Sequence, residues 1–121
     1  MDLHHSVDIV IAADCLFFDA FRQSLVDTLD YLLTFGEDAS ALIFAPRRKS
    51  TMEDFVNRSK AKGFDVAIES DYDEVVTQKL AEVRKSRDAT SFDEDIHYPL
   101  LLTLRRRPPG LSEKSIESTE A

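Results

Sequence analysis

The side chains best suited to chemistry follow an apolar run near the start of the chain. Residues 7–13 read Val-Asp-Ile-Val-Ile-Ala-Ala, Asp14 comes directly after them, and Phe17 stands three positions further on. A β-branched apolar run of this kind is typical of a buried strand. A carboxylate at the end of such a strand lies where ligands bind in open α/β sheets, and it can hold an ammonium group. The ring of Phe17 can form one side of the same binding site.

The same residues also fit a purely structural role. Asp after a strand is common turn chemistry, so Asp14 can cap the next turn while Phe17 belongs to the core. Ala12 and Ala13 are small enough for a close approach to a bound ligand, or for tight helix packing. Cys15 is the only cysteine, and we interpret it as a small buried hydrophobic residue rather than a nucleophile. The residue pattern leaves the two roles of Asp14 open.

A second candidate is the basic cluster Arg47-Arg48-Lys49, which follows another short apolar run. It is the only concentrated positive patch before residue 105 in a chain of net charge −8. Such a cluster can steer an acidic partner onto an acidic protein, and it equally fits a solvated loop beside a helix. No metal site is predicted, because the three histidines match no zinc spacing and the acidic residues 93–95 lack a calcium-loop pattern.

Composition narrows the classes of function. A length of 121 residues predicts at most one domain, and the hydrophobic fraction of 43% with eight Phe is enough for a core. The net charge of −8 argues against general nucleic-acid binding. One cysteine allows no intrachain disulfide and fits a reducing compartment. Without a signal peptide or a long apolar segment, we expect a soluble intracellular protein.

Hydrophobic spacing predicts the elements that must position these residues. Asp19 is a plausible N-cap of a helix, and Gly36 stands where its C-cap is wanted. Ser50 and Glu53 form a capping-box pattern that opens a second helix, which Gly63 ends. In order, we expect a strand from Val7, a helix, a strand over 40–45, a helix, a strand over 64–69, a surface helix within 70–95 and a last strand over 97–106.

Four segments, in this order and at these spacings, resemble a known family. The first looks like the end of the fourth strand of the class I (seven-β-strand) methyltransferases. Its Asp14-x-x-Phe17 is similar to a motif of the protein-lysine methyltransferases called family 16. Together the four resemble the C-terminal half of the calmodulin-lysine N-methyltransferases over roughly residues 7–106. The segments are Ile9–Phe17, Ala41–Arg48, Tyr72–Glu74 and Asp95–Leu102.

This resemblance implies an α/β fold, the C-terminal half of a Rossmann-like class I methyltransferase. It would hold strands four to seven and two or three helices, with the last strand antiparallel between its two predecessors. The N-terminal cofactor half is expected to be absent, because no G-x-G occurs and the three glycines are isolated. We therefore expect a partial domain over residues 1–106 and a disordered tail over 107–121.

The resemblance also implies an activity, S-adenosylmethionine-dependent methylation of a lysine of calmodulin, in cytoplasm and nucleus. Asp14 and Phe17 would then be catalytic, and S-adenosyl-L-methionine would lie against Ala12, Ala13 and Asp14. Methyl transfer needs little covalent help, because the sulfonium is already a reactive donor and the enzyme chiefly aligns the two partners.

Arg47, Arg48 and Tyr98 would contact the calmodulin substrate, while neither nucleic acid nor membrane is expected as a partner. Without a first-strand neighbour, the strand Val7–Ile11 would become a bare apolar edge and a site of self-association. We expect this shortened form to be inactive alone. The alternative is a non-catalytic product that acts as a protein-binding or interfering module.

Overall fold

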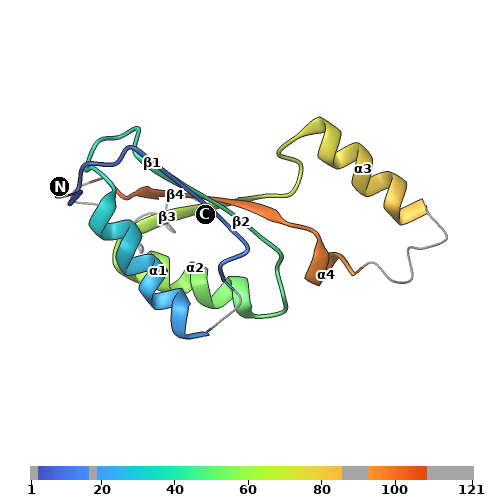
Figure 1. Ribbon diagram of the computed structural model, residues 1–121, viewed down its shortest axis with the longest axis horizontal. Coiled ribbons are helices and arrows are strands. Elements are labelled where there is room, and N and C mark those ends of the chain that lie inside the picture. Colours follow the sequence, from blue (N-terminus) through green and yellow to red (C-terminus); the bar gives the residue numbers. More distant parts are fainter. Residues whose placement is uncertain (1–2, 17–18, 86–92, 109–121) are drawn as a thin grey trace, which may run out of the picture.

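The computed structural model describes residues 3–16, 19–85 and 93–108, and within them four strands form one mixed sheet (Figure 1). The order of strands across the sheet is β1-β2-β4-β3. In chain order the elements are β1 (Ile9–Ala13), α1 (Asp19–Leu32), β2 (Ser40–Ala45), α2 (Thr51–Lys62), β3 (Phe64–Glu69), α3 (Glu74–Lys85), α4 (Glu94–His97) and β4 (Leu100–Arg106).

The last strand lies between its two predecessors, as the resemblance implied. β1 pairs with β2 in parallel, with Ile9 opposite Ser40. β4 pairs antiparallel with β2 on one side and with β3 on the other, so Leu102 lies opposite both Ile43 and Ile68. The carboxyl ends of β1 and β2 therefore meet at one edge of the sheet, which brings Asp14 and the basic cluster close together.

One face of the sheet packs against helices. Figure 1 shows α1 and α2 side by side on the same face, while α3 extends away from the sheet. Alternate residues of the strands point to this face and meet the inward sides of the two helices. The largest apolar side chains that are completely buried are Leu16, Val26, Leu29, Leu33, Ile43, Met52, Phe55, Phe64, Leu102 and Leu104.

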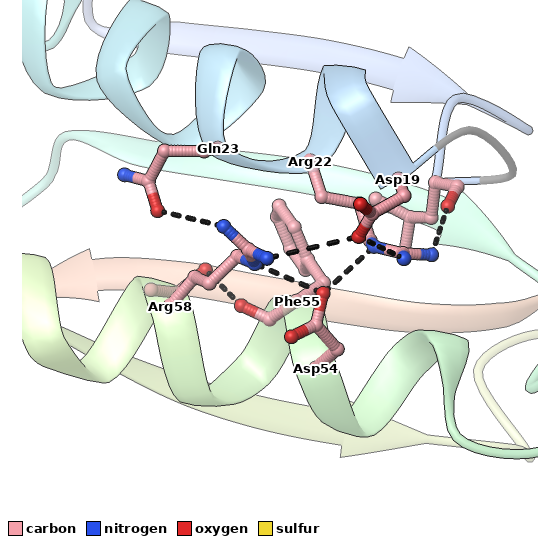
Figure 2. A network of polar contacts seen from close by, with 8 residues as sticks. Asp19, Arg22, Gln23, Asp54, Phe55 and Arg58 are labelled. Carbon is pink, nitrogen blue, oxygen red and sulfur yellow. Dashed lines mark hydrogen bonds and ion pairs between the residues drawn. The ribbon is translucent and has the colours of Figure 1, made fainter.

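A network of ion pairs locks α1 to α2 next to this core (Figure 2). Arg22 of α1 binds Asp19 at 2.7 Å and lies 2.8 Å from Asp54 of α2. Arg58 of α2 donates to the same Asp54 carboxylate at 2.9 Å. Because the Arg22 side chain is only 12% exposed, its contacts are better shielded from solvent than ordinary surface pairs. Arg22 also donates to the carbonyl of Leu16 at 3.2 Å, which fixes the chain just beyond Asp14.

Two expectations about element ends are wrong. The last strand begins at Leu100 and not at residue 97, because the Asp93 side chain caps a helical turn, α4, by accepting from the Asp95 N–H at 3.0 Å. Gly36 does not cap α1, which ends four residues earlier, at Leu32. The carbonyl groups at that end accept hydrogen bonds from Arg106 of β4 instead. Ser50 does stand at the N-cap of α2, but its side chain makes no capping hydrogen bond.

The other face of the sheet leaves part of β1 open. Ile9 and Ile11 are 58% and 67% exposed, although strands this apolar usually belong to sheets covered on both faces. Within the part of the chain that the structure describes, β1 pairs only with β2. An apolar edge strand of this kind is a template for pairing with another chain.

We therefore expect Ile11→Lys to reduce self-association of the 121-residue chain. The new ammonium would lie on the exposed face of the edge strand, where burying it in a second copy is costly. Light scattering at increasing protein concentration measures the effect. The matched control is Val75→Lys, because Val75 is 63% exposed on α3 and gains the same charge. Equal association of the two variants would show that β1 is not the contact.

Candidate functional site

Asp14 ends β1 in a strained backbone conformation. Its φ is 52°, in the left-handed region that few residues other than glycine adopt, although Asp tolerates it better than most. The Asp14 N–H donates to the carbonyl of Phe44 at 2.7 Å, which ties this turn to the end of β2. The carboxylate is 67% exposed. The sequence therefore places an accessible acid at the sheet edge, held in position by its backbone.

Arg48 is the partner that the fold brings to Asp14. Its guanidinium lies 3.5 Å from the Asp14 carboxylate, and the two residues are 34 positions apart in the chain. Both side chains line an open cavity of about 590 Å³, a size typical of small-molecule sites. An ion pair this exposed contributes little stability. A cationic ligand can therefore displace Arg48 at small cost.

The wall of this cavity comes from α1. Its residues are spaced three and four positions apart, so they form one stripe along the helix. Phe21 shares the helical spacing of the half-buried Leu25 and the buried Leu29, which predicts a place in the core, but it is 58% exposed and lies along the cavity. Ser24 and Thr28 were not predicted as site residues, although their helical spacing from Phe21 is visible in the sequence. The stripe consists of Phe21, Ser24, Leu25 and Thr28.

Arg47 and Tyr98 line a second cavity of about 350 Å³, away from Asp14. Tyr98 is 7% exposed, and its hydroxyl donates to the carbonyl of Ser70 at 2.6 Å. Burial raises the pKa of Tyr98, so this hydroxyl stays protonated at neutral pH. Arg84 of α3 binds the Glu94 carboxylate with two nitrogens, and this hydrogen bonding lowers the pKa of Glu94. The basic cluster thus contributes one arginine to each cavity.

The small residues before Asp14 lie elsewhere. Ala12 is half-buried and packs against the helix-covered core, whereas Ala13 is exposed. Neither lines the two cavities that hold Asp14 and Tyr98. Cys15 does line the larger cavity, and burial raises the pKa of its thiol, which therefore remains protonated and weakly nucleophilic. Phe17 lies outside the described residues.

The lining fits part of S-adenosylmethionine. The cavity beside Asp14 offers an apolar wall and one carboxylate, which suit the face of a nucleoside and a positively charged centre. No glycine-rich turn occurs anywhere in the printed sequence. Among the described residues no three His, Cys, Asp or Glu side chains group as metal ligands, and no helix could span a membrane.

The sequence of this chain is similar to that of a curated protein. No family model matches the chain. The chain is 31% identical over 104 residues to the calmodulin-lysine N-methyltransferase of Arabidopsis thaliana. The match covers 85% of this chain but 34% of the relative, so the chain spans about a third of the length of the curated relative that it matches. The similarity supports a relationship to methyltransferases. The four-stranded mixed sheet and its helices are compatible with part of a Rossmann-like methyltransferase fold.

Proposed function

We propose that this chain serves S-adenosylmethionine-dependent methylation of a lysine of calmodulin, and that its described residues form the substrate side of that site. The observation that carries the proposal is the similarity to a calmodulin-lysine N-methyltransferase over most of the chain. The Asp14 carboxylate at the carboxyl end of β1 supports it, because ligands bind at this edge of open α/β sheets.

Asp14 has the properties needed to position a lysine. The cofactor, when bound, supplies an electrophilic methyl group, so the protein chiefly orients the amine. The accessible Asp14 carboxylate can hold the incoming ammonium by a charge-assisted hydrogen bond in place of Arg48. Phe21 and Leu25 supply apolar surface for the methylene groups of the lysine. The amine must then lose a proton, and the open cavity leaves water available to accept it.

The basic loop, residues 47–49, supports an acidic protein as the substrate. Calmodulin is strongly acidic, and a chain of net charge −8 repels such a partner except where positive charge is concentrated. Arg47 and Lys49 are both exposed, and Arg47 lines the cavity that also holds Tyr98. Local charge of this kind raises the rate of encounter and orients the partner, an effect that falls with salt.

The alternative function is a protein-binding module without catalysis. The exposed apolar residues Ile9 and Ile11 favour it, because they show a surface of the described sheet that another polypeptide could cover. Both functions are compatible with binding to calmodulin, and the proposed function requires it. Only the first predicts that a methyl group is transferred, at S-adenosylmethionine concentrations high enough to occupy the weak site of the isolated chain.

One experiment separates the two functions. The chain is titrated with calmodulin by calorimetry, and the same mixture is incubated with labelled S-adenosylmethionine and analysed for label on calmodulin lysines. Binding with label supports the proposed function, and binding without label supports the protein-binding module. Absence of both binding and label would contradict the proposed function.

For the same titration we expect Arg47→Gln combined with Lys49→Gln to weaken calmodulin binding about tenfold at low salt. The matched control is Lys85→Gln with Arg105→Gln, which removes the same charge from exposed positions outside the loop. We expect the control to bind nearly as the original chain does. An equal loss of calmodulin affinity in the loop variant and in the control variant would mean that only net charge matters, and the loop would not be the contact.

A further inference from the structure

The basic loop has a backbone that its own sequence does not favour. Arg48 and Lys49 are consecutive residues with φ of 47° and 58°, and neither is glycine. Each such residue costs roughly 1–2 kcal/mol relative to the ordinary right-handed conformation. Strain of this kind persists only where surrounding structure holds it in place, and it clusters at functional sites.

Asp95 is the residue that holds the strained loop. The Arg48 N–H donates to the main-chain carbonyl of Asp95 at 2.7 Å, and the Lys49 N–H donates to its carboxylate at 2.8 Å. Two successive amides of the loop thus converge on one acidic residue that is 46 positions further along the chain. A hydrogen bond to a carboxylate is stronger than one to a neutral group.

Asp95 is itself fixed by neighbouring elements. Its N–H donates to the Asp93 side chain at 3.0 Å, and Glu94 beside it is bound by Arg84 of α3. Tyr98, at the end of the same turn, is anchored to the carbonyl of Ser70. The one-turn helix α4 that holds the loop is therefore itself bound to α3 and to the residue that follows β3.

We propose that Asp95 is a positioning residue that sets the conformation of the basic loop, and through it the place of Arg48 beside Asp14. No direct contact of Asp95 with the lysine or the cofactor is required. For calmodulin binding the inference rests on the proposed function. A simple charge argument predicts the opposite effect, because removing an acid near the loop should favour an acidic partner. Whether replacing Asp95 lowers or raises the affinity for calmodulin therefore separates a positioning role from a general charge effect.

The first test is limited trypsin digestion of the 121-residue chain, because the loop holds three trypsin sites. We expect Asp95→Ala to speed initial cleavage at residues 47–49 about tenfold, the effect of losing one charge-assisted hydrogen bond. Asp95→Asn keeps an oxygen that can accept from Lys49, so we expect only about a twofold to threefold increase. Cleavage after Arg58 and Lys62 of α2 serves as the internal reference. Asp38→Ala and Asp38→Asn are matched controls at an exposed position.

The order of the variants decides the outcome. Faster cleavage in the order Asp95→Ala, Asp95→Asn, original chain supports positioning. Equal cleavage of the two Asp95 variants, or of the Asp95 and Asp38 variants, would overturn it. Even if Asp95→Ala loses the fold, the milder Asp95→Asn still tests the inference against Asp38→Asn.

The second readout is calmodulin affinity of the same variants. Positioning predicts weaker binding for Asp95→Ala and nearly normal binding for Asp95→Asn, whereas a charge effect would strengthen both. Altered loop cleavage in a chain that does not bind calmodulin would keep the positioning role and reject the proposed function. Normal calmodulin binding of the Asp95 variants with unaltered loop cleavage would reject the positioning role and leave the proposed function in place.

Discussion

Arg106→Met is expected to lower the free energy of unfolding by about 3 kcal/mol. The Arg106 side chain of β4 is only 15% exposed. Its guanidinium binds the Asp30 carboxylate at 2.6 Å and donates to the main-chain carbonyls of Asp30 and Leu33 at 2.7 and 2.8 Å. A third carbonyl, that of Thr34, accepts from its Nε at 3.2 Å.

These carbonyl groups lie at the end of α1, where a helix leaves its last acceptors without partners of its own. A cation there is also favoured by the helix dipole. The Arg106 guanidinium lies 4.6 Å from the ring centre of Phe35 and 5.3 Å from that of Phe64, which adds cation–π attraction. Methionine keeps much of the stem but can satisfy none of the acceptors. The loss should therefore exceed that of an ordinary surface ion pair.

Urea unfolding followed by circular dichroism measures this difference. The matched control is Arg105→Met, at the adjacent but exposed position, for which we expect a change within about 0.5 kcal/mol. A similar loss in both variants would show that the α1 end does not depend on Arg106. Arg106→Lys should be nearly as harmful as methionine, because one ammonium cannot span the same set of acceptors.

S-adenosylmethionine is expected to bind the isolated 121-residue chain with a Kd of about 1 mM or weaker, a binding free energy of roughly −4 kcal/mol. The cavity beside Asp14 provides one carboxylate, two hydroxyl residues and an otherwise mostly apolar wall, and it is open to solvent. Its carboxylate already has Arg48 at 3.5 Å. The printed sequence offers no glycine-rich turn for the methionine end of the ligand. Few of the polar contacts that a tight site needs are therefore present.

Calorimetry at concentrations where the chain is monodisperse tests this expectation. Clear one-to-one binding at micromolar concentration would contradict it and would mean that the strand-end cavity holds the cofactor without such a turn. Asp14→Asn locates any binding that is found. Asparagine has nearly the same size and also tolerates the left-handed backbone of this position. Loss of affinity in that variant would place the ligand at Asp14, and unchanged affinity would place it elsewhere.

Local patterns predicted the regular elements because short-range preferences determine them. The strand Ser40–Ala45 and the helix ended by Gly63 were expected and are confirmed, since apolar spacing and a left-handed glycine act within a few residues. The antiparallel last strand between its predecessors followed from the resemblance and is confirmed. The end of α1 was misjudged because its cap, Arg106, comes from another element 76 positions away from Asp30.

The sequence by itself determined the candidate chemistry, an acid after a strand and a basic cluster after the next. Only the tertiary structure decided how they meet. Because β1 and β2 run parallel, their carboxyl ends share one edge, which brings the basic cluster to Asp14. Within the cluster, Arg48 rather than Arg47 lies beside Asp14. The strained loop that makes this selection is held by Asp95 of α4. No local pattern could reveal that contact, because its energy comes from atoms that are remote in the chain and adjacent only after folding.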